Sequence, residues 1–123
     1  MKRFFTVISA LVVASCGDGF IASNGLLVRP MDDGSFEIPF RGESGDSEFW
    51  CAAGEYVVRS RNLAPTTRIY RLSPPPRRSG EGIIFSLSPE GAQNPGIFIS
   101  SADDGLTAAF ASTLCRDRMF PND

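Results

Sequence analysis

Residues 46–61 read DSEFWCAAGEYVVRSR, and this segment is the most informative part of the sequence for the fold. Its apolar side chains recur at helical spacing, which predicts one helix with a single packed face. Asp46-Ser47-Glu48 supplies an N-cap candidate and acidic first-turn residues, and Glu55 and Arg59 form a favourable i,i+4 pair. Gly54 costs roughly 1 kcal/mol in a helix interior, so we expect it to permit close approach of another backbone. The apolar positions are Phe49, Trp50, Ala53, Tyr56 and Val57.

Short β-prone segments flank this helix on both sides. Residues 25–30 and 36–40 predict two strands joined by a hairpin turn, in which Gly34 takes a positive φ and an aspartate bonds the local backbone. Residues 66–72, 82–88 and 96–100 predict further strands, and 106–115 fit a strand or a helix. The expected fold class is therefore α+β, a mostly antiparallel sheet of four or five strands with one main helix packed on one face.

The N-terminus has the plan of a secretory signal. Lys2 and Arg3 precede an uncharged apolar run, residues 4–15, that is too short to span a bilayer as a permanent helix. We therefore expect residues 1–15 to be a signal peptide, residues 16–24 a tether, and residues 25–123 a single compact domain.

The end of this run, Val13-Ala14-Ser15-Cys16, resembles a lipobox, the cleavage site at which a cysteine becomes the lipidated first residue of a bacterial lipoprotein. Lipidation of Cys16 would hold the domain at the periplasmic face of a membrane. The alternative is ordinary cleavage near Ser15 or Ala22, which would leave a free protein in the periplasm.

The chain has three cysteines, and a lipid on Cys16 would leave Cys51 and Cys115 as one pair. An oxidising compartment favours a disulfide between them, with two unpaired buried thiols as the alternative.

Composition excludes most enzyme templates. The sequence has no histidine, and its lysine, Lys2, lies in the signal segment, so Ser-His and Cys-His pairs, histidine metal sites and Schiff-base lysines are excluded from the mature chain. The formal net charge of −2 is unfavourable for nucleic-acid binding. We expect no catalytic residue, cofactor or metal site.

Carboxylates are the remaining candidates for chemistry. The pairs Asp32-Asp33 and Asp103-Asp104 each precede a glycine, a context that favours turns over catalysis or calcium binding. Glu48 and Glu55 on the helix would matter if they faced a pocket. A carboxylate-dependent hydrolase or lyase therefore stays open as an alternative.

Two other motifs have a functional and a structural interpretation. Pro74-Pro75-Pro76-Arg77-Arg78 would form a stiff arm whose guanidinium groups could hold an anion, although a solvated connection between strands is the expected role. Trp50 could stack on a ligand, although a core position on the helix is expected.

The segment Phe49-Trp50-Cys51-Ala52-Ala53-Gly54-Glu55-Tyr56 resembles a Phe/Tyr-Trp-Cys-Ala-Ala-Gly-acid-Tyr segment in a family of small exported alphaproteobacterial proteins. The similarity extends to Asn24-Gly25-Leu26 and to Cys115-Arg116-Asp117. The resemblance implies export and pairing of Cys51 with Cys115, and it says nothing about a substrate.

Together these patterns predict a non-catalytic cell-envelope protein, a binding or structural module exposed to the periplasm. Its partner would be an envelope protein or a small molecule, with membrane contact through the lipid on Cys16. The alternatives are the hydrolase or lyase above, and a small-ligand carrier or inhibitor, which an apolar cavity between helix and sheet would identify.

Overall fold

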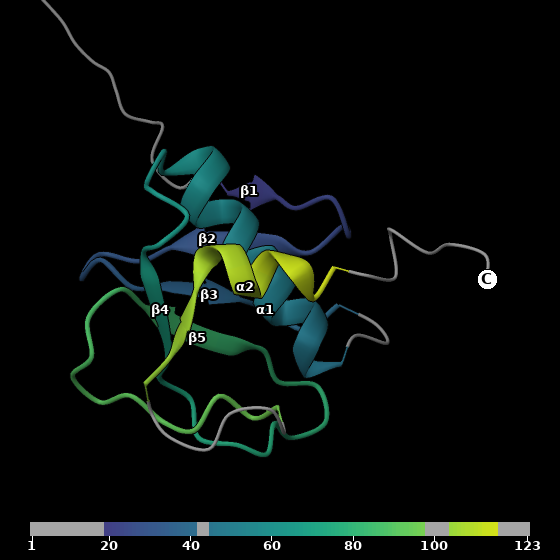
Figure 1. Cartoon of the computed structure of the whole chain (residues 1–123). Coiled ribbons are helices and arrows are strands. Elements are labelled where there is room, and N and C mark those ends of the chain that lie inside the picture. Colours follow the sequence, from purple (N-terminus) through teal and green to yellow (C-terminus); the bar gives the residue numbers. More distant parts are fainter. Residues whose placement is uncertain (1–18, 42–44, 98–103, 116–123) are drawn as a thin grey trace, which may run out of the picture.

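The computed structural model describes residues 19–41, 45–97 and 104–115. Six antiparallel strands form one sheet in the order β1-β2-β3-β5-β4-β6, and α1 and α2 lie together on one face of it (Figure 1). The α+β fold with a mostly antiparallel sheet and one main helix is confirmed. The elements are β1 (Phe20–Ile21), β2 (Leu27–Pro30), β3 (Phe36–Ile38), α1 (Asp46–Glu55), η2 (Tyr56–Ser60), β4 (Arg68–Arg71), β5 (Ile83–Ser86), β6 (Leu106–Thr107) and α2 (Ala108–Thr113).

The turn between β2 and β3 has the predicted chemistry. Gly34 has a φ of 93°, and the Ser35 carbonyl accepts from the Met31 N–H. The Asp33 carboxylate accepts from the Ser35 N–H at 3.0 Å and from the Ser35 hydroxyl at 2.6 Å. An aspartate therefore bonds the local backbone and closes the hairpin.

The predicted helix is present as α1 and its continuation η2, a π-helical turn. The N-cap is Gly45 rather than Asp46, which lies in the first turn, where an acidic side chain suits the helix dipole. The expected Glu55–Arg59 ion pair is formed, with 3.7 Å between Glu55 Oε1 and Arg59 Nη1.

Aromatic side chains fill the space between α1 and the sheet. Trp50, Phe36 and Phe85 are fully buried, and the Trp50 ring packs edge-on against Phe85 with 4.8 Å between centroids. Tyr56 packs against Phe36 at 4.7 Å. Trp50 is therefore a core residue, as expected, and its indole N–H is satisfied by the Pro95 carbonyl at 2.9 Å.

At Gly54 the backbones of α1 and α2 come close together. A Cβ at Gly54 would lie 2.8 Å from the Ala108 carbonyl oxygen and 2.9 Å from the Ser112 backbone nitrogen. Both are main-chain atoms, so the predicted close approach of another backbone is confirmed and requires a residue without a side chain.

Three segments differ from the expected assignments. Residues 106–115 contain both alternatives, because β6 leads directly into α2. Phe20 and Ile21, within the expected tether, form β1 and pair with β2. Gly96 and Ile97 lie outside the strands, and the rest of the strand expected over 96–100, like the signal segment and Cys16, lies outside the described residues.

Within the described ranges, the helices lack the length and apolar character required to cross a membrane.

Candidate functional site

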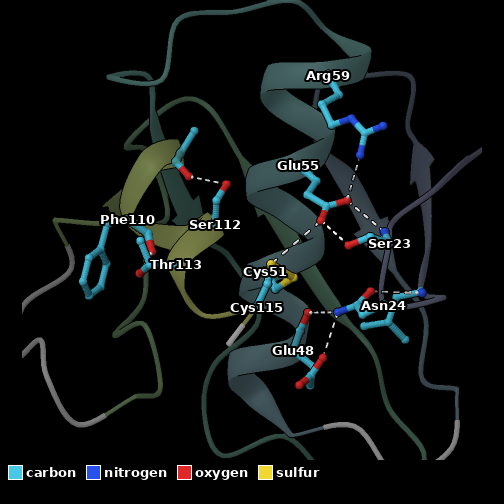
Figure 2. The surroundings of a disulfide bond; sticks show 12 residues. Ser23, Asn24, Glu48, Cys51, Glu55, Arg59, Phe110, Ser112, Thr113 and Cys115 are labelled. Atoms are coloured by element: carbon cyan, nitrogen blue, oxygen red, sulfur yellow. Dashed lines mark hydrogen bonds and ion pairs between the residues drawn. A yellow bond between two sulfur atoms is a disulfide. The ribbon is translucent and has the colours of Figure 1, made fainter. Parts of the chain in front are cut away.

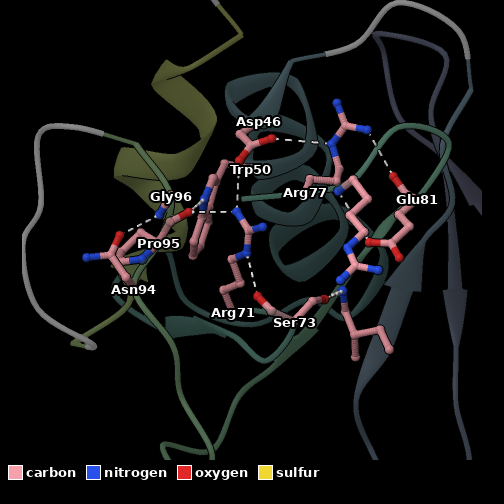
Figure 3. A network of polar contacts seen from close by, with 11 residues as sticks. Asp46, Trp50, Arg71, Ser73, Arg77, Glu81, Asn94, Pro95 and Gly96 are labelled. Atoms are coloured by element: carbon pink, nitrogen blue, oxygen red, sulfur yellow. Dashed lines mark hydrogen bonds and ion pairs between the residues drawn. The ribbon is translucent and has the colours of Figure 1, made fainter. Parts of the chain in front are cut away.

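Residues 73–82 make up most of the connection between β4 and β5, and a buried arginine fixes this segment at its base; we call it the proline loop (Figure 3). The Arg71 side chain is fully buried, and its Nη1 donates to Asp46 Oδ2 at 2.9 Å and to the Pro95 carbonyl at 3.1 Å. Its Nε donates to the Ser73 carbonyl at 2.7 Å. One guanidinium therefore ties β4, the start of α1 and the proline loop together through charge-assisted and carbonyl hydrogen bonds.

Arg77 belongs to the same network. Its Nε lies 3.3 Å from Asp46 Oδ1, and its Nη1 donates to the Glu81 carbonyl at 3.0 Å. The guanidinium carbon stands 5.3 Å from the Phe40 ring centroid and 4.9 Å from that of Phe49, within cation–π range.

The two arginines of the motif therefore have different environments. The expectation of a solvated loop is wrong for Arg77, whose side chain is 14% exposed because two aromatic rings and a carboxylate enclose it. Arg78 is exposed, as expected. The anion that Arg77 contacts is the chain's own Asp46, whereas Arg78 lines a groove beside the loop.

This groove lies between the proline loop and the sheet face that points away from the helices. Glu37 and Ile84 are cross-strand partners on that outer face, because their strand neighbours Phe36, Ile83 and Phe85 point into the core. The cavity volume is about 750 Å³. We call it the proline groove, and its lining residues are Glu37, Ser73, Pro74, Pro75, Pro76, Arg78, Glu81, Gly82 and Ile84.

Charges of both signs rim the proline groove, and both of its carboxylates have a structural partner. Glu37 Oε1 lies 3.2 Å from Arg29 Nη2, in a cross-strand ion pair. Glu81 Oε1 accepts from the Arg78 backbone N–H at 3.3 Å. Three prolines and Ile84 form the apolar part of the groove's wall. Such a mixture suits recognition of a ligand with apolar and polar parts.

The disulfide joins α1 to the segment that directly follows α2 (Figure 2). Cys51 and Cys115 are bonded, with 5.0 Å between their Cα atoms, within the range that a disulfide requires. Cys51 is fully buried and Cys115 is 8% exposed. The pairing expected from the sequence is confirmed.

Glu48 and Glu55 hold the N-terminal segment against α1 rather than face the proline groove. Glu55 accepts from the Ser23 N–H at 2.8 Å and from the Ser23 hydroxyl. Asn24 Nδ2 donates to Glu48 Oε1 at 2.9 Å and to the Glu48 carbonyl at 3.0 Å. Both helix carboxylates therefore have a structural role.

Three atoms of the kinds that bind metal ions lie close together at the disulfide. Cys51, Glu55 and Cys115 bring such atoms within 4.8 Å of one another. Both sulfurs are bonded to each other, so neither is a thiolate, the form that binds a metal. The group is therefore not a metal site in the oxidised protein.

The paired aspartates occupy turns or exposed positions where the structure describes them. The hydrogen bond from the Ser35 side chain has the largest effect on the pKa of Asp33, and the one from the Ser35 backbone N–H has the next largest. Together they hold this pKa below its ordinary value. Asp32 and Asp104 are exposed, and Asp103 lies outside the described residues. The Asp32-Asp33 pair is thus a turn element, as expected.

Sequence reasoning missed most of the proline groove. The period-two alternation of residues 36–38 and 83–86 places Glu37 and Ile84 on one face, and that signal could have identified the groove's floor. No pattern in the sequence predicts how the proline loop folds against that floor. No protein-family model, curated protein or solved structure matches the chain.

Proposed function

We propose that this protein is a non-catalytic binding module of the cell envelope, held at the periplasmic face of a membrane by a lipid on Cys16, which binds a segment of another envelope protein in the proline groove. The observation that carries the proposal is the groove itself. It is open to solvent, and the Arg71 network holds the base of its proline loop in place. Its lining contains apolar and charged residues. A peptide segment is the proposed ligand because it offers apolar and charged groups together.

Export is supported by the disulfide, since such bonds persist in oxidising compartments. The signal-like N-terminus, Lys2 and Arg3 before an apolar run, agrees with this. Both observations fit the family of small exported proteins that the Phe49–Tyr56 segment resembles.

Processing before residue 16 is supported over cleavage near Ala22. Ala22 is 4% exposed, and Phe20 packs against Tyr56 with 5.9 Å between ring centroids. A cut near Ala22 would remove β1 and these contacts, whereas a mature chain that starts at Cys16 keeps them all.

A carboxylate-dependent hydrolase is the second candidate, because Glu37 and Glu81 both line the proline groove. Their contacts with Arg29 and with the Arg78 N–H give both a structural role, which favours binding over catalysis. A carrier of an apolar ligand is less favoured, since aromatic side chains fill the space between α1 and the sheet.

Site-specific photo-crosslinking in growing cells tests the proposal. A photo-reactive amino acid at position 84, in the groove, should capture one defined envelope protein, and the same residue at the exposed Thr113 on α2 should not. The Ile84→Arg variant should lose binding of the captured protein, whereas Ser86→Arg on the same strand, outside the groove lining, should keep it.

Equal capture from positions 84 and 113, or unchanged binding by Ile84→Arg, would contradict the groove as the binding surface. A small molecule that protects position 84 from crosslinking would replace the protein partner with a small ligand. Turnover of a glycoside or ester that Glu37→Gln and Glu81→Gln abolish would favour the hydrolase.

A further inference from the structure

A second hollow lies around Arg68 at the start of β4, beside the edge strand β6. Two adjoining cavities of about 400 Å³ and about 290 Å³ share Arg68 and Asp104 in their linings. None of their lining residues belongs to the proline groove. We call the pair the Arg68 cleft, and its further lining residues are Tyr70, Pro89, Gly105, Leu106, Thr107 and Phe110.

Arg68 is held in place by the main chain opposite it. Its Nη1 donates to the carbonyls of Asp104 at 3.1 Å and Gly105 at 3.2 Å. Arg68 is also the cross-strand partner of Thr107. Because these contacts use a single nitrogen, the guanidinium is oriented in advance and keeps further N–H groups for a ligand.

The charges of the cleft select against charged ligands. Arg68 and the exposed Asp104 line both cavities, so an anion would meet the carboxylate and a cation would meet the guanidinium. A neutral ligand that both donates and accepts hydrogen bonds satisfies both groups. A carboxylate accepts from hydroxyl groups and a guanidinium donates to them.

An aromatic side chain lines each of the two cavities. Tyr70 lines one cavity, and Phe110, which is 38% exposed, lines the other. An aromatic ring offers an apolar face, and tyrosine adds a hydroxyl at its edge. A saccharide has the matching surfaces, since its ring presents C–H groups on its faces and hydroxyls around its rim.

We propose that the Arg68 cleft binds a short neutral oligosaccharide, with sugar rings against Tyr70 and Phe110 and hydroxyls bonded to Arg68 and Asp104. The site needs neither the lipid on Cys16 nor the proline groove. Its failure would therefore leave the proposed function standing, and the reverse also holds.

Amide chemical-shift titration of the purified mature protein tests the proposal. The probes are maltotriose, cellotriose and the N-acetylglucosamine trimer. At least one should produce saturable shifts centred on residues 68–70 and 104–110. Tyr70→Ala and Arg68→Ala should each lower the affinity about tenfold or more, which is about 1.4 kcal/mol. Tyr70→Phe, which keeps the ring, should retain most of the affinity.

The matched control is Ser86→Ala, because Ser86 is the cross-strand partner of Tyr70 but does not line the cleft. It should bind like the wild type, and the dispersion of the amide spectra should confirm that each variant is folded. Absence of saturable shifts with all three saccharides, or binding that Tyr70→Ala leaves unchanged, would overturn the proposal. Tighter binding of a charged peptide at the same residues would also overturn it.

Discussion

At the scale of single residues, Arg77 and Arg78 are neighbours in sequence with opposite environments. Arg77 packs between the Phe40 and Phe49 rings and contacts Asp46, whereas Arg78 is exposed at the rim of the proline groove. Sequence alone treats them alike, because the groups that enclose Arg77 lie about 28 to 37 positions earlier in the chain. Burial of a long basic side chain is decided by such distant partners.

This difference predicts unequal effects of the same substitution. Arg77→Ser should lower the free energy of unfolding by about 1–3 kcal/mol, since it removes a charge-assisted hydrogen bond and two cation–π contacts. Arg78→Ser should change it by less than about 0.5 kcal/mol, as at an ordinary exposed position. Urea denaturation of both variants measures this, and equal values for the pair would refute the packing described for Arg77.

The Asp33 carboxylate gives a pH-dependent prediction. Its pKa is lowered in the folded protein by the Ser35 hydrogen bonds, so its stabilising contribution is present above the unfolded-state pKa and is lost as the pH falls through the folded-state pKa. Ser35→Ala should therefore raise the pKa of Asp33 in a carboxyl NMR titration. The stability difference from the wild type should be largest near neutral pH and shrink in acid.

The control for this titration is Ser86→Ala, a serine outside the turn, which should leave Asp33 unchanged. An Asp33 titration curve that Ser35→Ala does not move would show that the turn hydrogen bonds are not its cause.

At the scale of elements, α1 was the most predictable part of the chain. Its apolar spacing and the Glu55–Arg59 pair at its junction with η2 are local consequences of the sequence, and the glycine at position 54 indicated that another backbone comes close. Residues of the Phe49–Tyr56 segment also have distinct structural roles. Trp50 packs in the core, Cys51 forms the disulfide, and Glu55 binds the N-terminal segment.

Elements defined by long-range pairing could not be predicted in the same way. β1 exists because Phe20 and Ile21 meet Val28 and Leu27, and two residues carry no periodic signal. β6 and α2 share one apolar stretch, so the boundary between them is set by pairing with β4 and by the Thr107 cap, whose hydroxyl accepts from the Phe110 N–H.

The contact between α1 and α2 predicts a strong effect of one methyl group. Gly54→Ala should destabilise the protein by about 1–3 kcal/mol, because the added Cβ meets main-chain atoms of α2 that can move only with the helix. Ala109→Ser, at an exposed position of α2, is the control and should be nearly neutral. Thermal denaturation measures both, and a neutral or stabilising Gly54→Ala would contradict the close packing.

At the scale of the whole molecule, the disulfide joins α1 to the segment after α2 across 64 positions of the chain. Closing so long a loop restricts the unfolded chain, so reduction should lower the free energy of unfolding by about 2–5 kcal/mol. Urea denaturation with and without dithiothreitol measures this.

The double variant Cys51→Ala, Cys115→Ala is the control for that measurement. It should match the reduced wild type and show no further response to dithiothreitol. Two reactive thiols in the unreduced wild type, titrated under denaturing conditions, would mean that the bond is absent in the cell.

At this scale we propose that the molecule works outside the cytoplasm as a disulfide-closed domain anchored at Cys16. Intact mass of the protein extracted from membranes, without reduction, tests this most directly. We expect a chain that begins at Cys16, carries an acylated glyceryl group there, and lacks the two hydrogen atoms lost on joining Cys51 to Cys115. A mass that corresponds to the complete sequence from Met1 with both thiols free would contradict it.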